Sequence, residues 1–142
     1  MQFNYPATLT EDKEDGGYVV TFVDFPEAIT QGENMEDALK QAVDCLEEAI
    51  ANRIVTKLTI PEPSKENNKH PLIQVPPTMA TKAALYLTTQ ESGLTKTGLA
   101  RYLNCDEKEI RRLLDPYHSS KLSRIERILS KLGRHLVIGV TA

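Results

Sequence analysis

The first part of the chain combines short β-like runs with one long helical pattern. β-branched and aromatic residues dominate segments 3–10, 18–25 and 27–32, which predicts three strands. Gly16 and Gly17 supply the positive φ angles that a hairpin turn between the first two strands requires. Pro6 cannot donate a hydrogen bond to a ladder, so we expect it at an edge or a bulge of the sheet.

A long amphipathic helix is predicted next. Asn34 suits its N-cap, and Asp37 occupies the third helical position, as in a relative of the capping box. Apolar residues then recur at three- and four-residue spacing, which predicts a helix of roughly twenty residues. Its buried face is predicted to contain Met35, Leu39, Ala42, Leu46, Ala49 and Ile50. Because segment 72–75 predicts one more strand, the region has the βββα pattern of an α+β domain with a further strand.

A proline-rich and polar segment separates this region from the rest. Prolines at 61, 63, 71, 76 and 77 rule out a continuous helix, and we expect residues 61–71 to be mobile. We therefore predict a domain over residues 1–76 and a second domain over residues 77–142.

The second domain is predicted to be all-α with a C-terminal strand. Helical patterns cover 79–92, 95–103, 106–115 and 121–133, and Gly133 is a natural helix stop. The first of these helices presents Ala80, Ala83, Ala84 and Leu87 as its predicted buried face. The apolar segment 135–140 predicts a strand.

The segment around Asn104 predicts a helix-turn-helix. Asn tolerates the left-handed region that a tight corner needs, and Asp106 with Glu109 forms a D-x-x-E capping box for the next helix. Apolar residues on both sides can pack the two helices at a steep angle. This arrangement often places its second helix in the major groove of DNA. The alternative is a helix pair that makes protein contacts only.

The candidate DNA-binding residues lie on the second helix and at two helix starts. Long cations suit phosphates and guanine edges, whereas Glu107 and Glu109 are unfavourable near phosphates. Glu107 could instead accept from a cytosine amino group, or simply face solvent, and Glu109 is expected to be occupied in the capping box. Few phosphates are neutralised per subunit, so we expect salt-sensitive binding by two subunits on two half-sites. The candidates are Thr95, Lys96, Glu107, Lys108, Arg111, Arg112, Ser119, Ser120 and Lys121.

Charge divides the chain in the same way as the helical pattern. Residues 1–70 contain 14 acidic and 6 basic residues, a net charge of −8, and residues 71–142 contain 6 acidic and 11 basic residues, a net charge of +5. This asymmetry indicates two partners of different electrostatics, and an acidic domain suits a basic partner. The alternative is a chance difference between two small domains.

The C-terminal segment is a candidate for self-association. A strand after a helical bundle has no partner in its own domain, which leaves apolar side chains and backbone groups unpaired. We predict that Leu136, Val137, Ile138 and Val140 pair with the same strand of a second copy across a two-fold axis. The alternative is that the strand folds back onto the N-terminal sheet.

Other features exclude several functions. No apolar run approaches the ~18 residues of a membrane span, and no secretory signal is recognisable, so we expect a cytoplasmic protein without a membrane partner. Cys45 and Cys105 have neither disulfide nor zinc spacing. We predict no metal, no cofactor and no enzymatic activity, because Asp24 is the only well-placed strand carboxylate and a two-metal nuclease site needs several.

The segment 16–50, with its D-x-P-x-x-x-T-x-G stretch at 24–32, resembles the HicB family of type II antitoxins. Segment 99–140 is similar to the helix-turn-helix subclass of that family, and the resemblance covers nearly the whole chain. It implies an N-terminal partial ribonuclease H-like fold without nuclease activity, which binds and masks a HicA toxin, a small basic ribonuclease that cleaves mRNA. It also implies a C-terminal half that represses its own operon at operator DNA, as a dimer or tetramer. By position, the resemblance implies DNA-reading residues at 107–112 and in the loop 118–121, which adds His118 to the candidates.

Given this resemblance, the acidic residues become candidates for toxin binding. They are Glu11, Asp12, Glu14, Asp15, Asp24, Asp44, Glu47 and Glu48. An ordinary solvated surface is the alternative for these residues. Two other functions stay open: a transcriptional repressor whose N-terminal domain senses a small ligand, and an adaptor that does not bind DNA.

Overall fold

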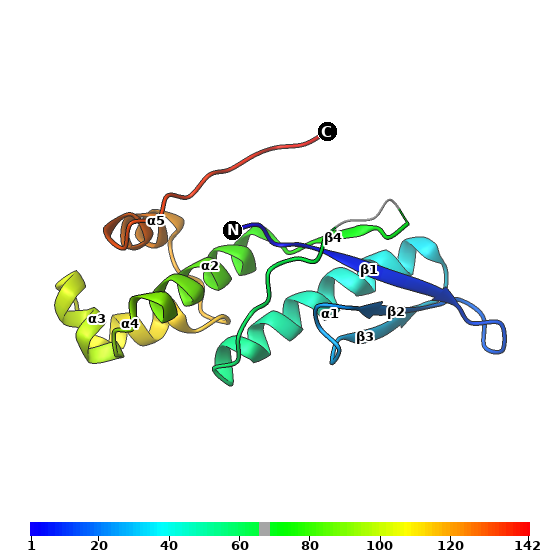
Figure 1. Ribbon diagram of the computed structural model, residues 1–142, viewed down its shortest axis with the longest axis horizontal. Coiled ribbons are helices and arrows are strands. Elements are labelled where there is room, and N and C mark those ends of the chain that lie inside the picture. Colours follow the sequence, from blue (N-terminus) through cyan, green and yellow to red (C-terminus); the bar gives the residue numbers. More distant parts are fainter. Residues whose placement is uncertain (66–68) are drawn as a thin grey trace. The chain divides into compact units, whose positions relative to one another are not determined.

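The computed structural model describes residues 1–65 and 69–142, which form two compact units, Met1–Ala80 and Thr81–Ala142 (Figure 1). The first unit contains a four-stranded sheet and a long helix, and the second is helical. The prediction of an α+β region followed by a helical region is therefore confirmed. The predicted mobile stretch 61–71 includes residues 66–68, which lie outside the described residues. Among the helices that are described, none is long and apolar enough to cross a bilayer.

The sheet of the first unit is antiparallel, with the strand order β3-β2-β1-β4. Its strands are β1 (Asn4–Glu11), β2 (Tyr18–Phe22), β3 (Ile29–Gly32) and β4 (Leu72–Gln74). β1 and β2 form the predicted hairpin, and Gly16 and Gly17 have φ angles of 78° and 76°. β2 and β3 both lie within their predicted ranges. Between them the chain turns, because Phe25 N donates to Phe22 O and Ala28 N donates to Phe25 O.

Pro6 lies where β1 has one neighbour only. It is opposite Leu72 of β4, whereas the β1–β2 ladder begins at Ala7. Ala7 N donates to Pro71 O at 2.9 Å, so the nitrogen of Pro6 faces the opposite side, where β2 has already ended. β1 is an inner strand of the sheet, so the predicted edge or bulge position is wrong. Pro6 instead lies just beyond the end of the β1–β2 ladder, where its nitrogen has no ladder hydrogen bond to donate.

The helix α1 (Met35–Val55) packs on one face of the sheet (Figure 1). The Asn34 side chain caps it by accepting from Asp37 N at 2.8 Å, and the Asp37 carboxylate accepts from Glu33 N at 2.9 Å. A Cβ atom on Gly32 would lie 2.2 Å from Ala38 N, so β3 and α1 approach closely there. This contact turns Ala38 toward the sheet and leaves Met35 46% exposed and Leu39 half-buried, which corrects the prediction that both are buried. The buried face consists of Ala38, Ala42, Leu46, Ala49, Ile50, Ala51 and Ile54.

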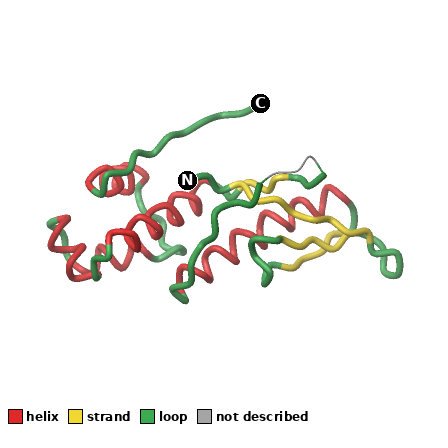
Figure 2. The backbone as a smooth tube through the Cα atoms, viewed as in Figure 1, coloured by secondary structure: helices red, strands yellow, loops and turns green. Residues whose placement is uncertain are grey.

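Helices joined by short loops make up the second unit (Figure 2). Their buried apolar side chains form one core. The helices are α2 (Pro77–Ser92), which begins in the first unit, α3 (Lys96–Leu103), α4 (Glu107–Leu114) and α5 (Leu122–Lys131). Leu85 of α2 packs among residues of the other three helices. The predicted buried face of α2 is largely wrong, because of its four residues only Ala83 is buried. Ala80, Ala84 and Leu87 are half-buried, while Lys82 and Tyr86 are buried. The core residues are Leu85, Leu99, Ala100, Leu103, Ile110, Leu113, Ile125, Ile128 and Leu129.

The C-terminal segment is extended but forms no strand in the single chain. Gly133 has a φ of 82°, and Arg134 N donates to Leu129 O at 2.8 Å, so the last helix stops as predicted. Residues 135–140 belong to no sheet of the described chain, because the single sheet there consists of β1 to β4. The predicted strand and the alternative of folding back onto the N-terminal sheet are both wrong for the isolated chain. Pairing with a second copy stays a prediction.

Candidate functional site

The corner between α3 and α4 has the geometry of a helix-turn-helix. Asn104 adopts the left-handed conformation with φ 53° and ψ 51°, and Cys105 N donates to Ala100 O at 2.9 Å. Asp106 then caps α4 by accepting from Glu109 N at 2.7 Å. Both features were predicted and are confirmed. They are local, since Asn relieves the steric cost of the corner and Asp satisfies a free N–H at the next helix start.

The outer face of α4 is positively charged. Ile110 and Leu113 are buried in the core, with 2% and 3% of their surface exposed. Lys108, Arg111 and Arg112 therefore lie on the opposite side of the helix, and all three are exposed. None of them belongs to an ion pair among the described residues. Two turns of helix thus present three cations to solvent; this set is called the α4 cation face below.

The two acidic residues of α4 are both engaged within the unit. Glu109 accepts from Arg124 Nε of α5 at 2.5 Å, in a half-buried ion pair. Glu107 accepts from the Thr97 hydroxyl of α3. The predicted D-x-x-E capping box is therefore only half right: Asp106 caps α4, but the Glu109 carboxylate accepts from Arg124 instead of completing the box. These contacts draw both carboxylates toward neighbouring helices and reduce their effect on the cation face.

The remaining predicted DNA-binding residues lie at two helix starts. Thr95 caps α3 by accepting from Gly98 N at 3.0 Å, and Lys96 beside it is exposed. At the start of α5, His118, Ser119 and Lys121 are exposed, and within residues 1–65 and 69–142 no side chain caps this helix. Ser120 differs from its neighbours because it is half-buried and accepts from Lys82 Nζ at 2.8 Å.

Lys82 is a residue that sequence reasoning missed. Only 6% of its surface is exposed, and its Nζ also donates to Arg112 O at 3.1 Å and Leu113 O at 2.9 Å. Burial lowers the pKa of Lys82 to about 8, against the smaller opposing effect of Asp115. A lysine at an otherwise apolar helix position was the available signal, but its acceptors are 30, 31 and 38 residues away.

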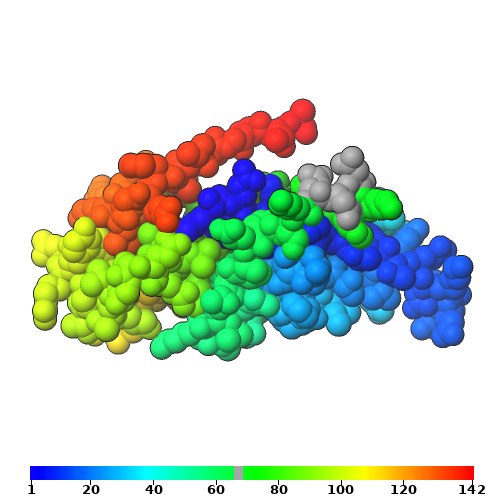
Figure 3. Space-filling view, in the orientation of Figure 1, coloured from blue at the N-terminus to red at the C-terminus, as the bar shows by residue number. Residues whose placement is uncertain are grey.

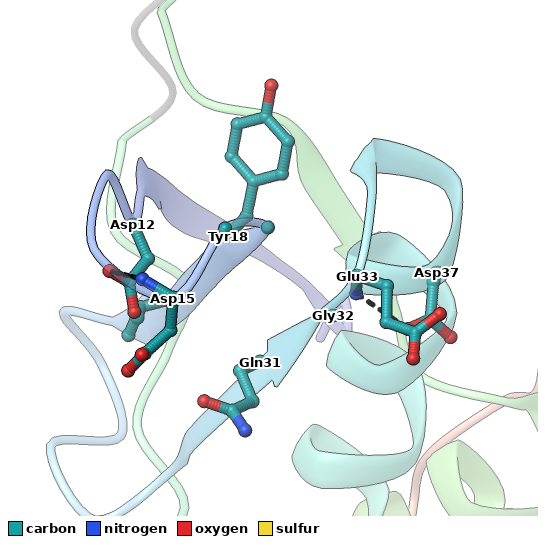
Figure 4. A pocket seen from close by; sticks show the side chains of 10 residues that line it. Asp12, Asp15, Tyr18, Gln31, Gly32, Glu33 and Asp37 are labelled. Atoms are coloured by element: carbon teal, nitrogen blue, oxygen red, sulfur yellow. Dashed lines mark hydrogen bonds between the residues drawn. The ribbon is translucent and has the colours of Figure 1, made fainter.

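The acidic hairpin loop borders an open cavity of about 620 Å³ in the first unit. Asp12 and Asp15 come from the loop, and Glu33 and Asp37 come from the start of α1 (Figure 4). Asp12 Oδ1 accepts from Glu14 N and Asp15 N at 3.1 Å, which stabilises the loop. Glu11 and Glu14 are exposed nearby. Among the described residues, no group of three or more metal-ligating side chains is arranged to hold a metal ion.

Asp24 is engaged in a contact inside the first unit. Its Oδ1 accepts from Ser64 Oγ at 2.5 Å, and its Oδ2 accepts from Ser64 N at 3.1 Å. The structure thus joins the D-x-P segment to the chain that follows α1. This gives Asp24 a structural explanation that sequence reasoning missed, because Ser64 lies 40 residues away.

Three further residues fasten the same chain segment. Tyr5 is fully buried, its hydroxyl donates to Pro61 O at 2.7 Å, and its ring meets Phe25 edge-on at 4.9 Å. The Cζ atom of Arg53 lies 4.7 Å from the centroid of the Phe25 ring, and Arg53 Nη1 donates to Thr59 O at 2.9 Å. Burial, with the nearby charge of Asp24, raises the pKa of Tyr5 to about 12. Tyr5, Asp24, Phe25, Arg53 and Ser64 are called the linker contacts below.

Glu27 completes the environment of Arg53. Its carboxylate accepts from Arg53 Nε at 2.6 Å and from Arg53 Nη2 at 3.0 Å. The hydrogen bond from Arg53 holds the pKa of Glu27 below its usual range. This two-point pairing orients the guanidinium over the Phe25 ring.

The remaining predicted protein-binding residues lie on two surfaces. Asp44 and Glu48 are exposed on α1 on the side away from the sheet, and Glu47 is half-buried. In the C-terminal segment, Val137, Ile138 and Val140 are 88%, 70% and 94% exposed, while Leu136 packs against the helical core. The space-filling view shows this segment (red) extended at the surface (Figure 3).

Comparison with known proteins identifies relatives over the whole chain. A family model described as "HicB_like antitoxin of bacterial toxin-antitoxin system" matches residues 4–84. The antitoxin HicB of Escherichia coli K12 is 38% identical over 132 residues, which cover 93% of this chain and 95% of the relative. Antitoxin HicB 1 of Photorhabdus laumondii is 34% identical over 96% of this chain and 86% of its own length. Antitoxin HicB of Pseudomonas fluorescens is 32% identical over 100% of this chain and 97% of its own length.

An α+β unit followed by a helix-turn-helix unit, with these relatives, defines a bacterial antitoxin, a non-enzymatic class of protein. The chain belongs to the HicB family. The family resemblance and the absence of enzymatic function were both predicted, and the comparisons confirm them.

Proposed function

We propose that this antitoxin neutralises a HicA-like, mRNA-cleaving toxin through its first unit and represses its own operon through the helix-turn-helix of its second unit. Residues 71–80 carry no charge, so the net charges of −8 and +5 apply to the two units. The α4 cation face is the observation that carries the DNA-binding part of the proposal.

The toxin-binding part depends on the acidity of the first unit. The hairpin loop, the cavity beside it and the outer face of α1 all present carboxylates. A ribonuclease that binds mRNA needs a basic surface, so opposite charges would speed its encounter with this unit. We assign the contact to Glu11, Asp12, Glu14, Asp15, Asp44, Glu47 and Glu48. Asp24 is a weaker candidate than these, because its carboxylate already accepts from Ser64.

Self-association would place two helix-turn-helix units on two half-sites. One unit offers three cations on α4 and a few groups at helix starts, so two copies are needed for useful affinity. The exposed apolar residues Val137, Ile138 and Val140 support pairing through the C-terminal segment. An antiparallel strand pair would satisfy the backbone groups of that segment.

Two experiments test the proposal. Co-expression with the small basic protein encoded beside this gene, followed by co-purification, should recover a complex and rescue growth. A gel shift with DNA from upstream of the gene should show binding that weakens strongly between about 50 and 200 mM salt. A steep loss over this range is expected when contacts to phosphates supply most of the affinity. A chain that binds neither the neighbouring protein nor this DNA would contradict the proposal. A small-ligand sensor would bind the DNA without the protein partner.

A further inference from the structure

We propose that Lys82 is a positioning residue of the DNA-binding surface, which holds the end of α4 and the loop after it in one arrangement. This inference rests on the proposed function of the helix-turn-helix. Lys82 donates to Arg112 O, Leu113 O and Ser120 Oγ, at 3.1, 2.9 and 2.8 Å. These four residues are called the Lys82 cluster.

The two backbone acceptors belong to the last turn of α4. Carbonyl groups in the last turn of a helix have no partner within the helix. At this end the backbone supplies Asp115 N, which donates to Arg112 O at 3.3 Å. A buried ammonium group that donates to two of these carbonyls therefore completes the helix end. α4 has eight residues only, so contacts at its ends have a large share in fixing its direction.

The third acceptor connects the helix end to the loop that precedes α5. Ser120 Oγ also lies 3.2 Å from His118 Nδ1, and His118 N donates to Asp115 O at 3.2 Å. The Lys82 cluster thus joins Arg112 of the α4 cation face to the exposed residues His118, Ser119 and Lys121. Both groups of DNA-binding candidates depend on one buried side chain for their relative placement.

Lys82 itself is not a phosphate ligand in this arrangement. Its side chain is buried, and its three N–H groups match the three acceptors of the cluster. Its removal should therefore weaken operator binding without removing a charge–phosphate contact. This distinction can be measured, because each lost phosphate contact lowers the slope of log K against log salt by about 0.9.

The test compares Lys82→Met with Arg112→Ala in the full-length protein. Lys82→Met keeps an unbranched side chain of nearly the same length, which can stay buried, but removes the donors. We expect operator affinity to fall about tenfold, with the salt slope of the wild-type protein retained. Arg112→Ala, the matched control, should lower both the affinity and the slope. Lys82→Arg keeps a cationic donor and should recover part of the loss.

A milder variant keeps the proposal testable if Lys82→Met does not fold. Ser120→Ala removes one acceptor and leaves Lys82 in place. We expect faster amide hydrogen exchange over residues 115–121 in the free protein, with exchange in α3 unchanged, and weaker operator binding at an unchanged salt slope. Wild-type exchange together with wild-type affinity in Ser120→Ala would overturn the proposal, as would a reduced slope in Lys82→Met. If the wild-type protein does not bind operator DNA, the proposed function fails, while the exchange measurement still tests the positioning role.

Discussion

The two units use ionisable side chains for the same structural task but leave opposite charges at the surface. In the first unit the linker contacts hold the irregular chain after α1, through Asp24 on Ser64 and Arg53 on Thr59. In the second unit Lys82 holds the end of α4 and the loop after it. In each case a charged group is placed where backbone donors or acceptors have no regular partner. The charges outside these contacts are mainly acidic in one unit and mainly basic in the other.

This comparison teaches which charges are available for a partner. Every charged residue contributes equally to the net charge of a sequence, whether or not a partner protein can reach it. Four of these residues have partners inside their own unit: Asp24, Glu107, Glu109 and Lys82. Setting aside the groups that have such partners leaves the α4 cation face in the second unit and the hairpin-loop and α1 carboxylates in the first, although Glu107 itself is exposed. Predictions that change the two kinds of charge separately can therefore break or sharpen the comparison.

The largest effect is expected for Arg111→Glu combined with Arg112→Glu. The change reverses two of the three charges on the α4 cation face, so operator affinity should fall by more than about 100-fold. Neutralisation of the toxin should survive, because these residues lie in the other unit. Gel shift and a growth-rescue assay measure the two activities.

The matched control for that variant is Arg127→Glu with Lys131→Glu. These residues are exposed on α5 and carry the same total charge change. The control should weaken DNA binding much less, and only through net charge. Equal loss in both variants, or loss of toxin neutralisation with the fold intact, would contradict the assignment of DNA binding to α4.

A second large effect is expected in the C-terminal segment. Val137→Asp with Ile138→Asp places charges in the predicted strand pair, and it leaves Leu136 to pack on the core. The mass measured by light scattering should shift toward the monomer, and operator affinity should fall as a consequence. Thr141→Asp with Ala142→Asp adds the same charge beyond the apolar stretch and should keep the wild-type mass. An unchanged mass in the first variant would reject pairing through this segment.

A smaller effect is expected for the linker contacts. Asp24→Ala or Ser64→Ala removes one side of a hydrogen-bonded pair, so unfolding of the first unit should cost about 1–2 kcal/mol less. The double variant should lose little more than Asp24→Ala alone, which denaturant titration can measure. Toxin affinity should stay within about threefold in Ser64→Ala. A large loss of toxin affinity in Asp24→Ala with normal stability would instead make Asp24 a direct toxin contact.

The parts of the fold that the sequence predicts correctly are those set by nearby residues. Gly16-Gly17, Asn34, Asn104 and Asp106 each act within about four residues, and their turns and caps were expected. The contacts that were missed join distant positions, such as Asp24 with Ser64 and Lys82 with Ser120. Met35 shows the same limit, because the close contact of Gly32 with Ala38 decides which side of α1 faces the sheet.

The candidate site follows the same division. The positions of Lys108, Arg111 and Arg112 on the outer face of α4 follow from helical periodicity, since Ile110 and Leu113 identify the buried side. The partners of Glu107 and Glu109 depend on how α3 and α5 pack against α4, and periodicity within one helix carries no information about that.

The smallest predicted effect is a difference between the units at alkaline pH. Tyr5 has a pKa of about 12 in the folded protein and an ordinary value of 10.0. The folded state therefore keeps a proton that the unfolded state loses, so this contribution is present below pH 10 and is lost as pH rises toward 12. The loss should reach about 1 kcal/mol at pH 11. Lys82 has the opposite sign, because its pKa falls from 10.5 to about 8 on folding, so the second unit gains stability between these values.

Denaturant titration at pH 8, 9.5 and 11 can separate the two contributions. Tyr5→Phe removes the titrating group from the first unit and should abolish its loss of stability above pH 10, although the hydrogen bond to Pro61 O is lost at every pH. Tyr102→Phe is the matched control, since that side chain is 61% exposed in the second unit. If the first unit loses the same stability at alkaline pH with Phe as with Tyr at position 5, then burial of Tyr5 does not couple its ionisation to folding. The comparison of the two units would then depend only on the hydrogen bonds of the linker contacts, because burial of an ionisable side chain would no longer predict a different response of each unit to pH.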